Sequence, residues 1–332
     1  MRVAINGFGR IGRMFFRATR NAPDIDIVAI NDLTDTETLA TLLKYDSVHG
    51  TYQGQIQAHN DTIEIDGKKV PVFQEKDPEH LPWQDYNVDV VLESTGFFRT
   101  RDLAKKHLVA GAKKVLLSAP AKGKKPVKTI VMGVNEHTYN GDDIVSNASC
   151  TTNSLAPLVK VIDDNFTVQH GLMTTVHSYT GSQNLVDGPH KDLRRGRSAG
   201  VNLVPTTTGA AAAIGEVIPR MDGKLDGMAI RTPTPDGSIT DLTVHVEKPT
   251  SAEEVNDLFQ NVSQHHLRGV LQYTQDPLVS SDIVDNPHSV VFDAEQTKVN
   301  GHGHMVKVLG WYDNEWGYSN RLIDLARHIA SN

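Results

Sequence analysis

The sequence predicts an α/β protein with a doubly wound, mainly parallel sheet in its first half and an α+β second half built on a mixed or antiparallel sheet. Two observations support this prediction. In the first half, short Val- and Ile-rich runs without strict polar alternation are separated by helical patterns, as in strands buried on both faces of a parallel sheet. In the second half the strands become longer and alternate between apolar and polar residues, which is typical of strands with one solvent-exposed face.

The elements of the first half follow each other as strand, helix, strand. The predicted strands are residues 2–5, 25–30, 88–93, 114–118, 129–132 and 144–146, and the predicted helices are residues 11–20, 36–44 and 101–110. Gly111 follows the last of these helices, at the position where a left-handed residue commonly ends a helix. This order predicts an N-terminal domain over residues 1–149.

The second half has its own pattern. Residues 239–247 place Leu242, Val244 and Val246 on one face of a strand and polar residues on the other. Further predicted strands are residues 172–177, 228–231, 289–293 and 305–311. Ser251, with Glu254 three residues later, predicts a capping box at a helix start. We therefore expect a second domain over residues 150–312 and a C-terminal helix within 313–332 that packs back on the first domain.

Composition limits the possible functions. The chain has 332 residues, of which 39% are hydrophobic and 22% charged, and this is ordinary for a globular protein. A net charge of -7 argues against a dedicated nucleic-acid partner, because such proteins usually carry a basic excess. The single cysteine excludes an intrachain disulfide, and no apolar run approaches the ~18 residues of a membrane helix. No apolar signal core precedes the first strand, so we expect an intracellular, cytoplasmic protein without a membrane partner.

A glycine-rich motif, Gly7-x-Gly9-x-x-Gly12, follows the first predicted strand and opens a helix. Gly7 would permit a tight turn, Gly9 would let a diphosphate approach the backbone, and Gly12 would let helix and strand pack closely. Asp32 ends the next strand, where its carboxylate can accept both hydroxyls of an adenosine ribose and repel a 2'-phosphate. A glycine-rich turn without a ligand explains this combination less well. The motif therefore predicts a Rossmann domain that binds NAD rather than NADP.

The only cysteine, Cys150, follows a predicted strand and precedes the helical pattern of residues 155–162. A helix N-terminus lowers the pKa of a thiol and favours the thiolate. The alternative is a buried, inert cysteine. Hydroxyl residues flank Cys150, however, and His177 ends a later strand, so a nucleophile and base pair is the better interpretation.

Three segments are candidates for anion binding. Residues 190–197 are basic, residues 206–209 place hydroxyls before a small-residue helix, and Arg231 ends a predicted strand. Helix starts and arginine forks both suit phosphate, although a basic run is more often a solvated loop. The histidines at 265–266 and at 302 and 304 have no Cys or acid cluster at ligand spacing, so we expect no metal site.

Taken together, these segments resemble glyceraldehyde-3-phosphate dehydrogenases. The resemblance covers both halves in order through the stretches INGFGRIGR, INDLTDTETLATLLKYDSVHG, ESTGFF, AGAKKVLLSAPAKG, SNASCTTNSLAP, TTVHSYTGSQNLVDGPHKDLRRGRSA, VPTTTGAA, PRMDGKLDGMAIRTP and WYDNEWGYSNR. Nine separate stretches make this match much more specific than any single motif.

The resemblance implies a role for each matching position. Cys150 would be the nucleophile and His177 the general base. The residues that would bind NAD are Gly7, Gly9, Arg10, Ile11, Gly12, Asp32, Lys76, Ser118 and Asn314. Two anion sites, one for the substrate phosphate and one for the attacking phosphate, would be formed by Ser149, Thr151, Thr180, Arg195, Thr208, Gly209 and Arg231. Which residue serves which site stays open.

The implied reaction is the glycolytic, NAD-dependent oxidative phosphorylation of D-glyceraldehyde 3-phosphate to 1,3-bisphosphoglycerate through a hemithioacetal and a thioester on Cys150. Family members are commonly homotetramers, with the loop of about residues 179–201 near the neighbouring cofactor site. The alternatives are a related erythrose-4-phosphate dehydrogenase and a non-catalytic nucleotide- or RNA-binding side role. Aspartate-semialdehyde dehydrogenase also pairs Cys and His, but it lacks the match around DLRR, TTTG and Arg231.

Two positions depart from the family pattern. Ser154 stands where family members commonly have a second cysteine, and Lys76 stands where bacterial relatives commonly have arginine. The first change removes any exchange between two thiols but leaves the nucleophile, and the second puts an adenine contact in doubt. Asp32 and Pro189 both match the NAD-using members.

Overall fold

The computed structural model describes residues 1–331 and divides into two compact units. The first unit comprises residues 1–130, 136–148 and 319 onward, and the second comprises residues 131–135 and 149–318. The chain therefore changes unit between Ala148 and Ser149, one residue before the boundary expected from the sequence. It returns to the first unit after Tyr318, and the short excursion at 131–135 has no counterpart in the sequence prediction.

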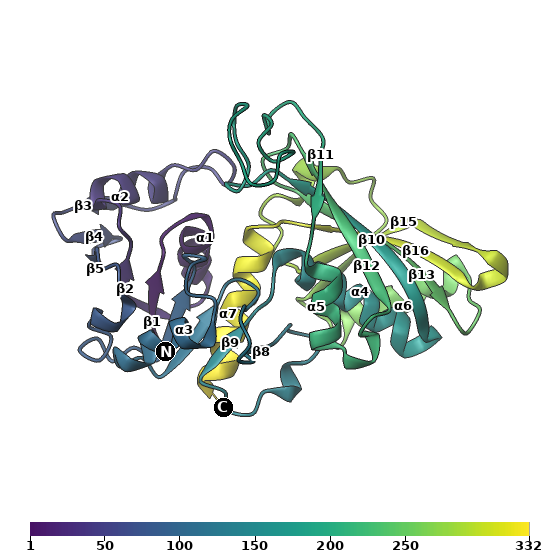
Figure 1. The fold of residues 1–332 in the computed structure, drawn as a ribbon, viewed down its shortest axis with the longest axis horizontal. Coiled ribbons are helices and arrows are strands. Elements are labelled where there is room, and N and C mark those ends of the chain that lie inside the picture. The colour runs from purple at the N-terminus through teal and green to yellow at the C-terminus, as the bar shows by residue number, and fades with distance from the viewer. Residues whose placement is uncertain (332) are drawn as a thin grey trace. The chain divides into compact units, whose positions relative to one another are not determined.

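The first unit is built on a nine-stranded sheet (Figure 1) with the order β3-β4-β5-β2-β1-β6-β7-β9-β8. Its strands are β1 Arg2–Asn6, β2 Asp26–Asn31, β3 Ile56–Ala58, β4 Thr62–Ile65, β5 Lys68–Phe73, β6 Val90–Glu93, β7 Lys114–Leu117, β8 Lys128–Thr129 and β9 Ile144–Ser146. The strands from β5 to β8 in this order pair in parallel, which confirms the doubly wound prediction.

Two details of this sheet differ from the prediction. The sequence did not reveal β3, β4 or β5. The short strands β3 and β4 form an antiparallel extension, and β5, which buries only Val70 and Val72 and contains a proline, pairs in parallel with β2. The strand expected at residues 129–132 ends at Thr129. The N–H of Val131 donates instead to Asn135 Oδ1 at 2.8 Å, and Gly133 turns the chain with a φ of +80°.

Four helices contribute to the first unit. They are α1 Arg10–Ala18, α2 Thr36–Lys44, α3 Arg101–Val109 and the part of α7, Trp316–Ser331, that starts at Ser319. Asp35 and Thr100 cap α2 and α3 through their side chains, and Gly111 has the expected positive φ of +102°. The end of α7 is tied to this unit by an ion pair between Arg327 and Asp24.

The second unit contains a seven-stranded sheet with the order β11-β12-β10-β13-β16-β15-β14. Its strands are β10 Val168–Ser178, β11 Val204–Thr207, β12 Leu225–Thr232, β13 Ser238–Val246, β14 Leu271–Thr274, β15 Val290–Asn300 and β16 Met305–Tyr312. The pairs β10–β12 and β14–β15 are parallel and the others antiparallel, so the sheet is mixed, as predicted. The short β11 and β14 were not predicted.

Three helices pack against this sheet: α4 Cys150–Phe166, α5 Ala210–Val217 and α6 Ala252–Gln264. Leu242, Val244 and Val246 of β13 are buried, as their alternation predicts. The capping box at α6 is only half formed. Ser251 Oγ accepts from the N–H of Glu254 at 3.1 Å, but the Glu254 carboxylate accepts from Thr250 Oγ1 at 2.8 Å instead of closing back on Ser251.

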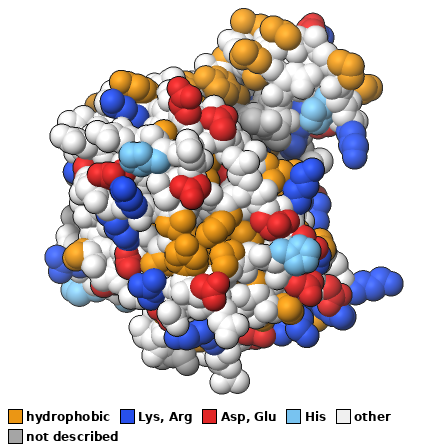
Figure 2. Space-filling view, turned by 90° about the vertical axis from the view of Figure 1, so that its left-hand side faces the viewer, with side chains coloured by type: hydrophobic (Ala, Val, Ile, Leu, Met, Phe, Trp, Pro, Cys, Tyr) orange, Lys and Arg blue, Asp and Glu red, His pale blue; other side chains and the backbone are white. Residues whose placement is uncertain are grey.

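The surface combines charged side chains with scattered apolar ones. On the face drawn in Figure 2, apolar side chains form a central patch with acidic and basic side chains around it, and further apolar side chains lie along the upper edge of the view. Among residues 1–331, no helix is both long enough and apolar enough to cross a bilayer.

Candidate active site

The glycine-rich loop joins β1 to α1, and its three glycines have different surroundings. Gly7 has a φ of +94°, and a Cβ added there would lie 2.6 Å from the Thr95 nitrogen. A Cβ on Gly12 would lie 2.2 Å from the carbonyl oxygen of Gly7, so the close packing of helix and strand requires glycine. A Cβ on Gly9 would meet no atom within 4 Å. Gly7 and Gly12 therefore serve the fold, whereas Gly9 keeps the space in front of the loop open.

The start of α1 and the carboxylate of Asp32 offer complementary groups for a dinucleotide. No side chain caps α1, so its first N–H groups and its positive dipole end face the open space at Gly9. Asp32 accepts from the N–H of Phe8 at 2.7 Å and from the N–H of Thr34 at 3.0 Å. A carboxylate can accept about four hydrogen bonds, so Asp32 braces the loop and still has acceptor capacity for two ribose hydroxyls.

A groove of about 430 Å³ lies beside this loop within the first unit. It is lined by Asn6, Gly7, Gly9, Asn31, Asp32, Leu33, Glu75, Lys76, Ser94, Thr95, Phe97 and Phe98. Leu33 and Phe97 expose 58% and 81% of their surface, so two large apolar side chains are available to pack against a planar ring. The donors, the acid and the apolar walls together fit NAD.

The remaining predicted cofactor residues have varied positions. Arg10 forms an ion pair with Asp46, and Ile11 follows it on the first turn of α1. Burial raises the pKa of Asp46, but hydrogen bonds from Arg10 and from the backbone outweigh it and lower that pKa to about 2.

Ser118 follows β7, and its N–H donates to the carbonyl of Glu93. Asn314 belongs to the second unit, where its buried side chain accepts from Ser238 Oγ at 2.5 Å.

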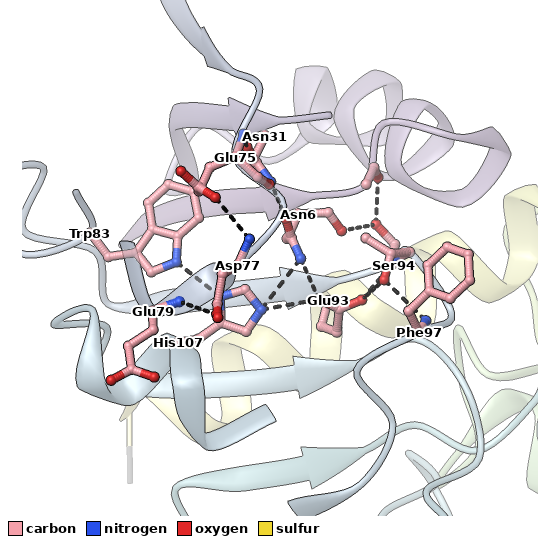
Figure 3. A network of polar contacts seen from close by, with 12 residues as sticks. Asn6, Asn31, Glu75, Asp77, Glu79, Trp83, Glu93, Ser94, Phe97 and His107 are labelled. Carbon is pink, nitrogen blue, oxygen red and sulfur yellow. Dashed lines mark hydrogen bonds and ion pairs between the residues drawn. The ribbon is translucent and has the colours of Figure 1, made fainter. Parts of the chain in front are cut away.

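Beneath the groove lies a buried polar network that sequence reasoning missed (Figure 3). Glu93 is its centre. One carboxylate oxygen accepts from Asn6 Nδ2 at 2.5 Å and contacts His107 Nε2 at 3.0 Å, and the other accepts from the N–H and the hydroxyl of Thr95. Asn6 Oδ1 in turn accepts from Asn31 Nδ2 at 2.7 Å. The network therefore ties β1, β2 and the loop after β6 together at the carboxyl ends of the strands.

The protonation of His107 follows from its partners. The indole N–H of Trp83 can only donate, and it lies 2.9 Å from His107 Nδ1. Nδ1 is therefore an acceptor, and the ring proton sits on Nε2, where it donates to Glu93. The signal in the sequence was the repeated asparagine at the ends of neighbouring strands, Asn6 and Asn31.

In the second unit, Cys150 is the first residue of α4. The preceding residue, Ser149, caps the helix by accepting from the N–H of Thr152 at 3.1 Å. Cys150 Sγ lies 3.6 Å from His177 Nε2, which is at the end of β10. The structure thus brings together the thiol and the imidazole that the sequence paired.

The electrostatics of this pair differ from the sequence expectation. Burial raises the pKa of the Cys150 thiol, and only the nearby Arg231 and hydrogen bonds around Thr151 oppose this effect. Burial and the charge of Arg231 lower the pKa of His177 to about 3. The expectation of a thiol pKa lowered by the helix start was wrong for this state, because desolvation is the larger effect. Both shifts favour the neutral forms of the thiol and the imidazole.

The strand register places one anion-binding candidate, Arg231, beside this pair. His177 of β10 is opposite Arg231 of β12, and Arg231 is opposite Val204 of β11. Arg231 Nη1 lies 2.7 Å from His177 Nδ1, while Arg231 Nε is buried without a hydrogen-bond partner in the described chain. A buried guanidinium nitrogen in this condition calls for an anionic ligand.

The other anion-binding candidates form hydrogen bonds with neighbouring residues of the second unit or lie at the start of α5. Arg195 Nε donates to Thr206 Oγ1 at 2.9 Å. Gly209 is the exposed residue that precedes α5, and no side chain caps the helix there. Thr208 Oγ1 accepts from the N–H of Ala210. The hydroxyl of Thr180 contacts Ser182 Oγ at 2.9 Å. The hydroxyl of Thr151 is buried against Tyr312, so its side chain does not face a ligand in this state.

Tyr312 is a second residue that sequence reasoning missed. Its ring stands edge-on to the ring of His177, with 5.9 Å between the centroids. Its hydroxyl lies 3.0 Å from Thr151 Oγ1 and 2.7 Å from Thr175 Oγ1. Tyr312 therefore braces the imidazole and the first turn of α4 at once. It lies within the WYDNEWGYSN stretch, which was noted without a role for this tyrosine.

A Rossmann unit with a glycine-loop groove, followed by a unit with a buried thiol–imidazole pair, defines an NAD-dependent oxidoreductase that acts through cysteine. Comparison with known proteins agrees with this class. The NAD binding domain of glyceraldehyde 3-phosphate dehydrogenase matches residues 1–101, and the C-terminal domain of the same family matches residues 149–314. The chain belongs to the glyceraldehyde-3-phosphate dehydrogenase family.

Full-length relatives share about half of their residues with this chain. A glyceraldehyde-3-phosphate dehydrogenase 2 of Streptomyces avermitilis is 53% identical over 334 residues, covering 100% of this chain and 99% of the relative. A glyceraldehyde-3-phosphate dehydrogenase 2 of Bacillus subtilis is 51% identical, covering 100% and 97%. The glyceraldehyde-3-phosphate dehydrogenase of Mycobacterium avium is 54% identical, covering 99% and 98%.

Proposed function

We propose that this protein oxidises D-glyceraldehyde 3-phosphate with NAD and inorganic phosphate to 1,3-bisphosphoglycerate, as a step of glycolysis. The observation that supports this most directly is the contact of 3.6 Å between Cys150 Sγ and His177 Nε2 beside the buried guanidinium of Arg231. A thiol nucleophile, a base and a phosphate-binding arginine are the groups that this reaction needs.

The chemistry follows from these groups. Cys150 attacks the aldehyde carbon to give a hemithioacetal, and His177 takes the hydroxyl proton as the carbon is oxidised, a contribution of roughly 10²- to 10⁴-fold in rate. Bound NAD supplies the hydride acceptor. A phosphate oxygen then attacks the resulting thioester carbon, the C–S bond breaks, and the acyl phosphate leaves. The backbone N–H of Cys150, at the start of α4, would help to stabilise the oxyanion.

The residue roles extend this proposal. NAD would be held by Gly7, Gly9, Arg10, Ile11, Gly12, Asp32, Lys76, Ser118 and Asn314. The two phosphates would be held by Ser149, Thr151, Thr180, Arg195, Thr208, Gly209 and Arg231. For Thr151 we propose the backbone N–H as the donor, because its hydroxyl is buried against Tyr312. Residues 1–149 would form the cofactor domain, with the helix of 313–332 joined to it, and residues 150–312 the catalytic domain.

The assembly and location belong to the same proposal. The relatives' shared family supports a homotetramer that works in the cytoplasm without a dedicated nucleic-acid partner. The Ser154 departure is compatible with this function, because its hydroxyl is buried and lies 3.0 Å from Thr240 Oγ1 in a stable core contact.

The test is NADH absorbance with glyceraldehyde 3-phosphate and NAD, measured with and without inorganic phosphate. Multiple turnovers that require phosphate would support the proposal. Fast turnover without phosphate would mean that water resolves the thioester. That result, together with a preference for erythrose 4-phosphate in a parallel assay, would favour the related erythrose-4-phosphate dehydrogenase activity instead.

A further inference from the structure

One carboxylate oxygen of Glu93 begins a chain of hydrogen bonds that ends at a wall of the groove (Figure 3). This oxygen, Oε2, accepts from Asn6 Nδ2 at 2.5 Å, and Asn6 Oδ1 accepts from Asn31 Nδ2 at 2.7 Å. The side chain of Asn31 then pairs with the backbone of Glu75: Nδ2 donates to the carbonyl at 2.9 Å, and Oδ1 accepts from the N–H at 2.9 Å. The amide thus continues the pairing of β2 with β5 beyond the last paired residues, Asn31 and Phe73. We call this chain the Glu75 arm.

The other oxygen of Glu93 begins a second chain, which we call the Phe97 arm. This oxygen, Oε1, accepts from the N–H of Thr95 at 2.9 Å and also from its hydroxyl. Thr95 Oγ1 in turn accepts from the N–H of Phe97 at 3.1 Å. Thr95 and Phe97 line the groove, as Glu75 does. Two walls of one groove are therefore held by the two oxygens of one carboxylate.

The carboxylate of Glu93 has its acceptor sites filled. In addition to the two arms, Oε2 lies 3.0 Å from His107 Nε2, which donates to it. Four donors therefore point at two oxygens, and a carboxylate has about four acceptor sites. Trp83 holds the far side of the His107 ring at 2.9 Å, so the carboxylate is fixed from behind as well as along both arms. No other side-chain type accepts in this way on two sides at once.

The two walls lie where the adenine base of a dinucleotide would be. The start of α1 at Gly9 suits the diphosphate, and the carboxylate of Asp32 suits the ribose hydroxyls. The base would then follow beyond Asp32, among lining residues that include Leu33, Glu75 and Phe97. A planar base gains most when it fits between two walls whose separation is already set, because less ordering is needed on binding.

We propose that Glu93 is the positioning residue that sets the separation of the two walls at the adenosine end of the groove, and with it the affinity for the adenosine half of the cofactor. This inference rests on the proposed function, because the cofactor would be NAD. With 2% of its surface exposed, Glu93 acts through Asn6, Asn31 and Thr95 rather than by contact with the cofactor. Its loss should change KM for NAD rather than kcat, since the thiol–imidazole pair belongs to the other unit.

Calorimetric titration with AMP and with NAD tests this inference, because AMP carries the adenosine end alone and its binding needs no catalysis. Glu93→Gln changes the centre of the two arms. Asn31→Asp breaks the Glu75 arm, since an oxygen replaces the NH₂ group that donates to Asn6 and Glu75. Thr95→Val keeps the side-chain shape but removes the hydroxyl of the Phe97 arm. Glu79→Gln is the control, because this exposed side chain belongs to neither arm.

We expect Glu93→Gln to raise the Kd of AMP and the Kd of NAD by the same factor, about tenfold, because the new NH₂ group faces a donor of one arm. The value of kcat should stay close to that of the wild type, and Glu79→Gln should match the wild type throughout. A loss of stability alone would lower the number of binding sites per chain and leave the Kd of the folded molecules unchanged. Circular dichroism and the fitted number of sites separate these two effects.

The variants of the single arms should show that both depend on Glu93. Asn31→Asp and Thr95→Val should each weaken AMP and NAD by equal factors in the wild-type background. Each should have a smaller effect in the Glu93→Gln background, because the centre of its arm is already changed. If Glu93→Gln failed to fold, Asn31→Asp and Thr95→Val would still decide through their equal effects on AMP and NAD.

Several results would overturn the inference. They are an unchanged Kd for AMP in folded Glu93→Gln, weaker binding of NAD with normal binding of AMP, full additivity of the arm variants with Glu93→Gln, and no binding of AMP by the wild type. The proposed function is judged separately by the phosphate-dependent NADH assay. A wild type that forms NADH only with phosphate, with a Glu93→Gln variant that binds AMP normally, would leave that function standing and remove only the role of Glu93.

Discussion

Two buried histidines, one in each unit, are held in opposite ways. His107 lies in a network where each contact agrees with the others: Trp83 donates to its Nδ1, and its Nε2 donates to Glu93. His177 lies between Arg231 and Ser178, which demand different protonation of the same nitrogen. Both rings are buried, with 0% and 4% of their surface exposed, so burial alone does not distinguish them.

This difference in hydrogen-bond partners distinguishes a structural histidine from a histidine proposed to react. Because both ring nitrogens of His107 have a hydrogen-bond partner, the ring proton stays on Nε2 and the network is rigid. Arg231 and Ser178 both contact one ring nitrogen of His177, and the other ring nitrogen faces the thiol of Cys150. A fully satisfied network costs free energy when it is broken, because a buried polar group then loses its partner.

The largest expected effect is the loss of the nucleophile. Cys150→Ser should lower the rate of NADH formation by roughly 10⁴-fold or more, because a hydroxyl is a much weaker nucleophile than a thiol. Catalytic groups that act together lose most of their effect when one of them is removed. NAD titration by fluorescence should give an unchanged affinity, since the glycine loop and Asp32 are in the other unit. Substantial remaining turnover would end the covalent mechanism.

Next in size is the contrast between the two histidines. His177→Asn should lower kcat by about 10²- to 10⁴-fold and leave the melting temperature and NAD affinity close to those of the wild type. His107→Asn should do the reverse and lower the melting temperature while kcat per folded molecule stays nearly constant. Steady-state kinetics and calorimetry on both variants check this. A collapse of NAD binding in His177→Asn would make His177 structural.

The network around Glu93 should be sensitive to an uncharged substitute. In Glu93→Gln an NH₂ group must face donors from Asn6, His107 or Thr95, and one unsatisfied buried donor costs about 1–3 kcal/mol. Urea unfolding and NAD binding should both weaken, because Thr95 lines the groove. Glu79→Gln is the matched control, and we expect a change within about 0.5 kcal/mol at this exposed site. Equal stability of the two variants would contradict the role of Glu93.

Two glycines of the loop should separate folding from cofactor binding. Gly12→Ala places a methyl against the Gly7 carbonyl and should lower the free energy of unfolding by about 1–3 kcal/mol. Gly9→Ala has open space and should fold normally, but it should bind NAD more weakly because the methyl occupies the approach to the backbone. Urea unfolding and NAD titration of both variants measure this, and normal NAD affinity in Gly9→Ala would place the diphosphate elsewhere.

The smallest expected effect is a pH dependence at Asp46. Its pKa is lowered to about 2 in the folded state, so its ion pair with Arg10 contributes stability above the unfolded pKa near 4. That contribution is lost as the pH falls from about 4 towards 2. Asp46→Asn should remove this part of the slope. Urea unfolding of both proteins between pH 5 and 2.5 measures it, and parallel curves would show that Asp46 does not titrate in this range.

Much of the architecture was predictable from the sequence. Residues 36–44 form α2 as predicted, because Asp35 supplies a side-chain cap and the apolar spacing is helical. Strands β3, β4, β5, β11 and β14 were missed. Four of them have three or four residues, too few positions to establish a period, and β5 buries only two of its six residues. The pairing of Cys150 with His177 was predicted, whereas Glu93, His107 and Tyr312 gain their roles only through partners distant in the chain.

The sequence by itself determined the alternation of strands and helices, the need for glycine at positions 7 and 12, and the cysteine at a helix start, because these depend on local backbone geometry and side-chain period. Only the tertiary structure decided the direction of the pKa shifts of the reactive groups. The thiol pKa is raised rather than lowered, because burial outweighs the helix dipole. The tautomers of His107 and His177 depend on Trp83, Glu93 and Arg231, which long-range strand pairing and packing bring within hydrogen-bond distance.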